Sequence, residues 1–435
     1  MSSSLANPSG RPGSSLLPKP AYSGALKAIS AFLVLVYLVN CCTPLRLHVD
    51  MLRYFAIKDC IELGCPPDSD AAKDYLPFGY TVLLLVLSKL GVLKSWSIVL
   101  INCIYLFGGL YLIFRIFRSS IDPLLCLVLV MLNWTTLKFT IHPLSEMQYL
   151  FFSSASIYLF YQYTREKKIW LLLAAFGLGS IAFLTRSVGI ALAAALVTGL
   201  LWQYRTELIG LIRKHKLVVA GVLIVLIGVV IFSRQLGLNH YTGVFNKQFK
   251  EGVTLPRILG WHFTEWAEIC FNVSIVKVSP YLHGGIADKL FLVAGICFFA
   301  GFVYLVFLRK NQIPFIVKSY LFFYSVVMFD WPFYDPRFWV PVVPFIVVSI
   351  AASGIFTVRR WRAPFVLYFC VYSLLGALSV GYLSYTSLNR EVMARTHANG
   401  VYRNEYETVF YGKPLSDTAT HIDQAALEVI RRYDR

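Results

Sequence analysis

ALKAISAFLVLVYLVNCCTPLRLHVDMLRYFAIKDCIELG, residues 25–64, joins a long apolar run to a segment in which apolar and charged side chains are mixed. The run at 25–45 is long enough to cross a hydrocarbon core of about 30 Å as a helix. The segment at 48–64 has the length and mixed polarity of a helix that lies at a membrane surface. This stretch therefore predicts a membrane-spanning helix followed by an interfacial helix.

The composition of the whole chain supports a membrane protein. Of its 435 residues, 57% are hydrophobic and only 14% are charged, and the mean hydropathy is +0.63. Soluble domains keep about a quarter of their residues charged. Apolar runs of about 17 to 25 residues recur along the chain. We expect an all-α polytopic domain at 25–385, preceded by a disordered cytoplasmic tail at 1–24 that is rich in Ser, Pro and Gly.

The distribution of basic residues predicts the orientation of this domain. The formal charge of +17 would suit nucleic acid, but the bases lie in short groups between apolar runs, so no nucleic-acid partner is expected. Two apolar runs separate each group from the next, which puts every group on one side, the cytoplasm. The groups are Arg115 and Arg118; Arg165, Lys167 and Lys168; 205–216; Arg309 and Lys310; and Arg359, Arg360 and Arg362.

One apolar run near the amino terminus is not expected to cross. Three runs separate the basic tail from Arg115, whereas two ends on the same side require an even number of crossings. The run at 77–93 is short, opens with Pro77 and Gly79 and contains Lys89, so we predict that it lies along the outer surface. About 11 crossings remain, with the amino terminus inside and the carboxyl terminus outside. They are 25–45, 96–114, 121–141, 144–163, 170–185, 188–204, 217–232, 289–308, 314–329, 338–357 and 364–385.

This topology concentrates the acidic residues outside the cytoplasm. The outer face receives a first loop at 46–95 with interfacial helices, a second large loop at 233–288, and a carboxyl-terminal tail at 386–435. The inner loops hold only Glu166 and Glu207 among the acids. Any acid–base chemistry is therefore expected at the outer face.

Asp50 has two interpretations. Its carboxylate can cap a helix that runs from Met51 to about Leu63, where Gly64 suits the end. Alternatively, it is a general base at the rim of the membrane, with Tyr54 one helical turn away on the same face. Position alone leaves both open.

Several other apolar runs also begin with a few polar residues at the outer side. The segments are YLPFGYTVLLLVLSKLG from Tyr75, HPLSEMQYLFF from His142, FLTRSVGIALAAALV from Phe183 and YDPRFWVPVVPFIVV from Tyr334. In order they show Pro-x-Gly-Tyr, Ser-Glu, Leu-Thr-Arg-x-x-Gly and Asp-Pro-Arg-Phe, and Asp-x-x-x-Tyr at Asp50 precedes them. This series resembles the type C (GT-C) glycosyltransferases over residues 25–385, and within them the polyprenyl-phosphate-sugar-dependent branch that includes protein mannosyltransferases and the lipid A aminoarabinose transferase.

The resemblance implies a GT-C fold and a membrane enzyme that moves a hexose or pentose from a polyprenyl-phosphate carrier to an extracytoplasmic acceptor, usually with inversion. It implies that Asp50 is the catalytic base. Many relatives carry a second acid where Met51 stands, so no metal or other cofactor is expected, and Asp59 and Glu146 are possible substitutes. Ser187 stands where relatives often have Pro, and the tail at 386–435 matches no segment of the family.

Cationic and polar residues at the outer ends are the candidate substrate-binding groups. Arg186 and Arg337 suit a phosphate clamp, because a guanidinium binds phosphate oxygens as a fork, or they anchor helix ends at the interface. Glu146 either binds sugar hydroxyls or caps the helix that it opens. Lys138 and His142 are placed beside them because they share the outer side. Together with Tyr54 and Asp59, these residues complete the predicted site.

Two further segments have alternative interpretations. The segment around Trp261, His262, Glu265 and Trp266 either covers a sugar pocket or rests on lipid, and the preference of Trp for the interface favours lipid. Cys60 and Cys65 either pair in an oxidising compartment or are free thiols, and their closeness in sequence favours free thiols. The sequon at Asn133 falls within an expected span, and the sequon at Asn272 matters only in a eukaryotic lumen.

Two other functions compete with this transferase. A flippase or transporter for a lipid-linked sugar would bury charged groups near the midplane, whereas these spans are largely uncharged. A polysaccharide polymerase or ligase would use pyrophosphate-linked donors at the same face. No phosphate-binding Gly-rich loop, zinc-protease motif or nucleophile elbow is present. Membrane lipids are expected partners, and a bacterial inner membrane is the expected location.

The topology predicts the outcome of a reporter fusion. A reporter that is active only outside the cytoplasm, fused after Lys94, should be active because 77–93 does not cross. The same reporter fused after Arg118 should be inactive. Activity after Arg118 without activity after Lys94 would reverse the assignment of the first three runs.

Overall fold

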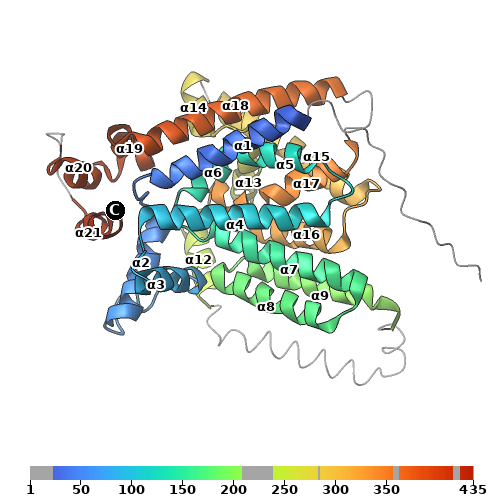
Figure 1. The fold of residues 1–435 in the computed structure, drawn as a ribbon, viewed down its shortest axis with the longest axis horizontal. Coiled ribbons are helices and arrows are strands. Elements are labelled where there is room, and N and C mark those ends of the chain that lie inside the picture. The colour runs from blue at the N-terminus through green and yellow to red at the C-terminus, as the bar shows by residue number, and fades with distance from the viewer. Residues whose placement is uncertain (1–22, 208–238, 283–284, 356–361, 415–421, 435) are drawn as a thin grey trace, which may run out of the picture.

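The computed structural model describes residues 23–207, 239–282, 285–355, 362–414 and 422–434, and these ranges are helical without a strand. The expected all-α fold is therefore confirmed (Figure 1). The expected crossing at 217–232 and nearly all of the amino-terminal tail lie outside the described residues.

Several of the longer helices run along the long axis of the molecule (Figure 1). The longer helices are α1 (Ser23–Val39), α4 (Ser95–Ile116), α7 (Glu146–Glu166), α8 (Ile169–Thr185), α9 (Gly189–Gln203), α13 (Leu255–Phe271), α15 (Ile286–Val303), α16 (Phe315–Phe329) and α18 (Arg362–Leu388). The shorter ones are α2 (Val49–Leu63), α3 (Gly79–Lys89), α5 (Pro123–Leu132), α6 (Trp134–Thr140), α12 (Asn239–Lys250), α14 (Ile275–Val278), α17 (Val343–Ala352), α19 (Arg390–Thr396), α20 (Arg403–Tyr411) and α21 (Gln424–Tyr433). Among these, α2, α3, α19, α20 and α21 gather at one end of the molecule (Figure 1).

Several helices have the length and composition of membrane spans. Within the described residues, four helices pass both tests: Gly24–Cys42, Ser95–Ile116, Ile286–Leu308 and Ala363–Leu388. The helices α8, α9 and α16 are apolar but shorter. The central α7 carries polar residues and is covered by its neighbours α4 and α8, so it needs no uniformly apolar surface. The number of crossings, about 11, stays a prediction.

The expected crossing at 121–141 is not one straight helix, because the chain bends by 71° between α5 and α6. Asn133 stands at the bend in an extended conformation, and its Oδ1 accepts a hydrogen bond from the backbone N of Thr135 at 3.2 Å. Asn272 bonds to the backbone on both sides of the bend. Its Nδ2 donates to Leu132 O at 2.9 Å, and its Oδ1 accepts from Trp134 N at 2.8 Å. Both asparagines are fully buried, so neither sequon is an exposed acceptor in this fold.

The helix after the first span forms as expected, but its cap differs. α2 ends at Gly64, whose φ is 81°. The cap is His48, whose Nδ1 accepts from the backbone N of Asp50 at 3.2 Å, so the interpretation of Asp50 as the cap is wrong. The carboxylate of Asp50 is free to contact other side chains from the first turn of the helix.

The short helix α3 packs against α2 and α8 at the end of the bundle. Its 11 residues span about 16 Å, roughly half a hydrocarbon core. This length agrees with the prediction that 77–93 does not cross. Cys60 and Cys65 form a disulfide just after α2, with a Cα–Cα distance of 4.9 Å, so the expectation of free thiols is wrong.

The carboxyl-terminal helices hold the backbone that leads into α2. The Tyr406 hydroxyl donates to Leu45 O and accepts from Leu47 N, both at 2.8 Å. His397 Nε2 bonds to Leu47 O at 2.7 Å, and Asp434 accepts from Leu45 N at 2.6 Å. The described parts of the tail, 386–414 and 422–434, therefore pack on the first outer loop, and α21 lies next to α2 (Figure 1).

Replacing Asn272 with Ala should destabilise the protein. The change leaves Leu132 O and Trp134 N without these partners at a buried bend, which costs about 1–3 kcal/mol for each unsatisfied group. The thermal unfolding midpoint in lipid nanodiscs measures the effect. Asn246→Ala, at an exposed position of α12, is the control and should leave the midpoint unchanged. Equal midpoints for the two variants would contradict this role of Asn272.

Candidate functional site

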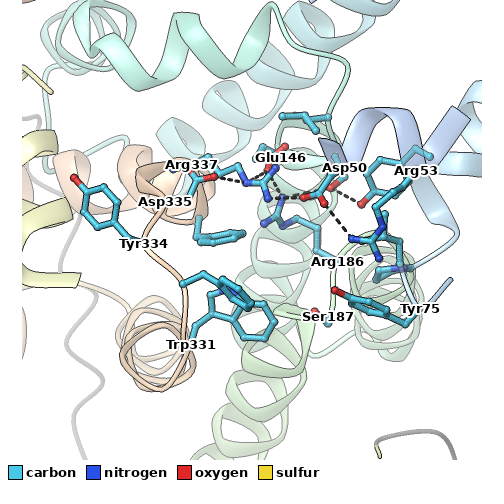
Figure 2. Close-up of a pocket in the computed structure, with 17 residues that line it drawn as sticks. Asp50, Arg53, Tyr75, Glu146, Arg186, Ser187, Trp331, Tyr334, Asp335 and Arg337 are labelled. Carbon is cyan, nitrogen blue, oxygen red and sulfur yellow. Dashed lines mark hydrogen bonds and ion pairs between the residues drawn. The ribbon is translucent and has the colours of Figure 1, made fainter. Parts of the chain in front are cut away.

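A pocket of about 350 Å³ opens at the end of the bundle where α2, the start of α7, the turn between α8 and α9, and the segment before α17 meet (Figure 2). One wall is charged and the other is largely aromatic. The pocket is lined by Asp50, Arg53, Tyr54, Tyr75, Leu76, Pro77, Leu144, Ser145, Glu146, Arg186, Ser187, Trp331, Phe333, Tyr334, Asp335, Arg337 and Phe338.

Asp50 projects into this pocket between two arginines. Its Oδ2 pairs with Nη2 of Arg337, and its Oδ1 lies 3.2 Å from Nη1 of Arg53. Burial raises the pKa of Asp50, but the charge of Arg337 and its hydrogen bond outweigh burial, with help from His48 and Arg53, so the pKa lies below its usual value. Asp50 is therefore a carboxylate at neutral pH and can accept a proton or a hydrogen bond.

Arg337 is the most connected side chain of the pocket. Its Nε lies 2.9 Å from Asp335 Oδ2 and 3.9 Å from Glu146 Oε1, and its Nη1 lies 3.4 Å from His48 Nδ1. Asp335 also caps the short helix that begins at Pro336, because its Oδ1 accepts from the backbone N of Arg337 at 3.0 Å. The guanidinium is thus held between carboxylates from separate parts of the chain.

Arg186 enters the pocket from the turn after α8 and pairs with Glu146, the first residue of α7. Glu146 is 1% exposed, and within the described residues its Oε2 has no hydrogen-bond partner. Tyr54 lies across from them, with its hydroxyl 3.2 Å from Ser145 Oγ. Burial raises the pKa of Tyr54 to about 12, so its hydroxyl keeps its proton at neutral pH.

Two glycines explain two of the motifs. A Cβ at Gly189 would lie 2.5 Å from Phe183 Cα, so the tight turn that presents Arg186 needs glycine. A Cβ at Gly79 would lie 2.7 Å from Leu184 O, so the start of α3 can pack directly on the end of α8. The Leu-Thr-Arg-x-x-Gly and Pro-x-Gly-Tyr motifs therefore meet at the end of α8 beside the pocket.

A buried His–Glu pair on α13 binds the segment that lines one wall of the pocket, without lining the pocket itself. Glu265 accepts from Asp335 N at 2.6 Å and from Trp339 Nε1 at 2.8 Å, and its other neighbour His262 bonds to Trp331 O at 2.7 Å. Both interpretations of this segment are wrong for these side chains. His262 and Glu265 are fully buried, and Trp266 is 2% exposed, so they neither rest on lipid nor line the pocket.

The structure brings five of the predicted residues together and places three elsewhere. Asp50, Tyr54, Glu146, Arg186 and Arg337 line the pocket, and the other three do not. Asp59 faces a smaller cavity between α2 and α21, where it pairs with Lys58 at 2.6 Å. His142 is buried against Lys138 O and packs on His397, with ring centres 5.4 Å apart. Lys138 Nζ lies 5.1 Å from the centre of the Trp134 ring.

Several residues that line the pocket are not among the site residues predicted from the sequence. Arg53 is held by Asp74, with Nη2 2.7 Å from Oδ1, and lies 4.6 Å from the centre of the Tyr75 ring. Asp335 stands within the quoted Asp-Pro-Arg-Phe motif, and the aromatic wall of Trp331, Phe333 and Phe338 flanks it. Within the described residues, no group of three or more His, Cys, Asp or Glu is placed to hold a metal ion. The expectation that no metal is needed stays a prediction.

The comparisons with known proteins concern the fold. No protein-family model matches the chain, and no curated protein matches it. Among solved structures, the fold is similar to the crystal structure of ArnT from Cupriavidus metallidurans bound to undecaprenyl phosphate. The TM-score is 0.48 and the sequence identity 14%, over 95% of this chain and 86% of that chain. ArnT is a GT-C lipid A aminoarabinose transferase.

Gly189→Ala should disturb the pocket through the turn that carries Arg186. The added methyl group meets backbone 2.5 Å away, so the turn must shift, at a cost of about 1–3 kcal/mol. We expect a lower thermal midpoint and weaker binding of inorganic phosphate to the pocket. Gly177→Ala on the preceding helix α8, where a Cβ meets nothing within 4 Å, is the control. Identical behaviour of the two variants would show that the turn tolerates a side chain.

Proposed function

We propose that this protein is an integral membrane glycosyltransferase that transfers a sugar from a polyprenyl-phosphate-linked donor to an extracytoplasmic acceptor, with inversion and with Asp50 as general base. The observation that carries the proposal is the meeting of an ionised carboxylate and two buried guanidiniums in one pocket at the end of the helical bundle.

The reaction needs a base on the acceptor and cations on the leaving group. A single displacement at C1 of the sugar inverts its configuration, with the acceptor arriving opposite the departing phosphate. Asp50 takes the acceptor proton, because it is ionised and lies at the pocket wall. Arg186 and Arg337 bind the phosphate oxygens as forks and stabilise the charge that develops on them.

The remaining walls suit a sugar. Aromatic faces such as Trp331 and Phe333 pack against the apolar side of a sugar ring, and the free Oε2 of Glu146 accepts from a hydroxyl. A volume of about 350 Å³ lies at the small end of the range for ligand pockets. It fits one sugar with its phosphate better than a long glycan.

The charge of the pocket favours a monophosphate-linked donor. Asp50, Glu146 and Asp335 balance Arg53, Arg186 and Arg337 among the lining residues. A phosphodiester adds one negative charge to this balanced set, whereas a pyrophosphate-linked donor adds two at a surface where charge is costly. This difference weighs against the alternative function, a polysaccharide polymerase or ligase that uses pyrophosphate-linked donors.

The site also weighs against a flippase. A transporter of the alternating-access kind binds its cargo near the bilayer midplane between half-helices. Here the charged pocket is lined by residues of α2 and of the segment just before α3, and α2 and α3 lie at one end of the molecule (Figure 1). We place this end outside the cytoplasm, in a bacterial inner membrane, where a lipid donor approaches from the bilayer and an acceptor from the aqueous side.

The transferase and its base are tested together in lipid nanodiscs with a panel of polyprenyl-phosphate sugars. Wild-type protein should transfer or release a sugar, and Asp50→Asn should lower the rate by about 10²–10⁴-fold, the usual contribution of a general base. Asp59→Asn, on the same helix but outside the pocket, should keep the wild-type rate. Equal rates for all three proteins would exclude Asp50 as the base. No turnover with any donor would favour transport or pyrophosphate-linked glycans.

A further inference from the structure

Every guanidinium that lines the pocket is already paired with a carboxylate. Arg53 is held by Asp74 and Asp50, Arg186 by Glu146, and Arg337 by Asp50 and Asp335. A donor phosphate therefore finds no unpaired arginine on the pocket wall. To take a paired N–H donor from one of these guanidiniums, a phosphate oxygen must displace a carboxylate.

The pair between Arg186 and Glu146 is expensive to open. The side chain of Glu146 is 1% exposed, and its other basic neighbour, Arg337 Nε, is 3.9 Å away. Removing Arg186 would leave a buried carboxylate with little compensation, and breaking such a pair is strongly destabilising. This pair is expected to persist and to offer the phosphate only the outer edge of its guanidinium.

The pair between Arg337 and Asp50 opens more easily. The Asp50 side chain is 22% exposed and keeps Arg53 at 3.2 Å when Arg337 leaves. Arg337 in turn keeps Asp335, which binds Nε rather than Nη2. Both partners thus retain one opposite charge after the exchange.

We propose that the donor phosphate takes the Nη2 donor of Arg337 away from Asp50, so that the base is released only when the donor is bound. This inference rests on the proposed transferase function. It makes Arg337 both a ligand of the leaving group and the group that controls the base, and it implies that the donor binds before the acceptor is deprotonated.

The exchange follows the movement of charge during the reaction. The acceptor O–H gives its proton to Asp50, which becomes neutral, while its oxygen forms a bond to C1 of the sugar. The bond between C1 and the phosphate oxygen breaks, and the polyprenyl phosphate leaves with the electron pair and gains one negative charge. Negative charge therefore moves from Asp50 to the phosphate. The Nη2 contact of Arg337 likewise moves from Asp50 to the phosphate.

Release should make Asp50 a stronger base. The groups that face it are Arg53 and His48 around the start of α2, Arg337 with Asp335 from the segment before α17, and Glu146 through Arg337. Burial raises the pKa of Asp50, and Arg337 is the largest influence that lowers it. When a phosphate neutralises Arg337, burial and the phosphate charge both act to raise the pKa.

The test follows the protonation of Asp50 by infrared difference spectroscopy on the full-length protein in nanodiscs. Asp50→Asn identifies the Asp50 carboxyl band, and the protein is titrated with and without sugar-free polyprenyl phosphate. The titration midpoint of wild type should rise by about one pH unit or more with the lipid, which corresponds to about 1.4 kcal/mol. Dolichol or another uncharged polyprenol serves as the control lipid and should cause no rise.

Arg337→Gln separates the two roles of the guanidinium. Its Asp50 midpoint should already be high without lipid and should not rise further when polyprenyl phosphate is added. If this variant does not fold, Arg337→Lys, which keeps a charge without the fork, should show a smaller rise than wild type.

Two outcomes would overturn the inference. Polyprenyl phosphate that binds wild type without moving the Asp50 midpoint would leave Arg337 on Asp50 and would exclude the exchange, while sugar transfer in the nanodisc assay would still stand. No binding of polyprenyl phosphate at all would exclude the exchange, and joined with no transfer from any donor it would remove the proposed function as well.

Discussion

The ion pair between Asp50 and Arg337 joins two parts of the chain that are 287 positions apart, and the pocket exists only where they meet. α2 supplies the carboxylate, and the segment before α17 supplies the guanidinium. A charged pair that is partly removed from water is stable only when its geometry is held by its surroundings. Much of the structure around the pocket can be understood as that support.

The two residues of this ion pair are held in place by different elements. The carboxyl-terminal helices bind the backbone at Leu45 and Leu47, which fixes the entry into α2 and therefore the position of Asp50. Arg337 is positioned by Glu265, which accepts hydrogen bonds from the backbone of Asp335 and the indole of Trp339, on either side of Arg337. Burial raises the pKa of Glu265, and its three hydrogen-bond partners compensate for the cost of keeping it there. The carboxyl-terminal tail matches nothing in the family that the motifs resemble, and its described parts, 386–414 and 422–434, thus have a structural role beside the site.

The sequence could predict the residues of the charged wall but not their pairing. Arg186, Glu146 and Arg337 stand at the outer ends of apolar runs, and sidedness alone brings such residues to one end of a bundle. Helical periodicity separates the two acids of α2, since nine residues make about two and a half turns and place Asp59 on the face opposite Asp50. Tyr54, four residues from Asp50, stays on the same face. Arg53 also lies within a turn of Asp50, but only the fold shows that Asp74 and Tyr75 return to hold it.

Other features depend on contacts that no local pattern contains. The bend between α5 and α6 looks like a continuous apolar run in sequence, and it is possible because Asn272, far along the chain, bonds to the backbone on both sides. His48 replaces Asp50 as the cap of α2 because the carboxylate has a stronger partner in Arg337. The sequence favours a lipid contact for α13, yet His262, Glu265 and Trp266 pack inward, since a helix with polar groups on one side can satisfy them within the protein as well as at an interface.

The balance of charge in the pocket connects this architecture with the proposed chemistry. Arginines left unpaired near a bilayer would be costly to desolvate, so a phosphate site built there gains by holding its cations with carboxylates until the ligand arrives. Such a site binds less tightly than one with free cations, because each phosphate contact replaces an existing one. The exchange is useful when one displaced carboxylate is the catalytic base, because part of the binding energy of the donor then goes into activating that base rather than into tighter binding of the ground state. In this pocket only Asp50 combines partial exposure, a second cation and a place on the wall, which makes it the carboxylate that the donor can displace at least cost.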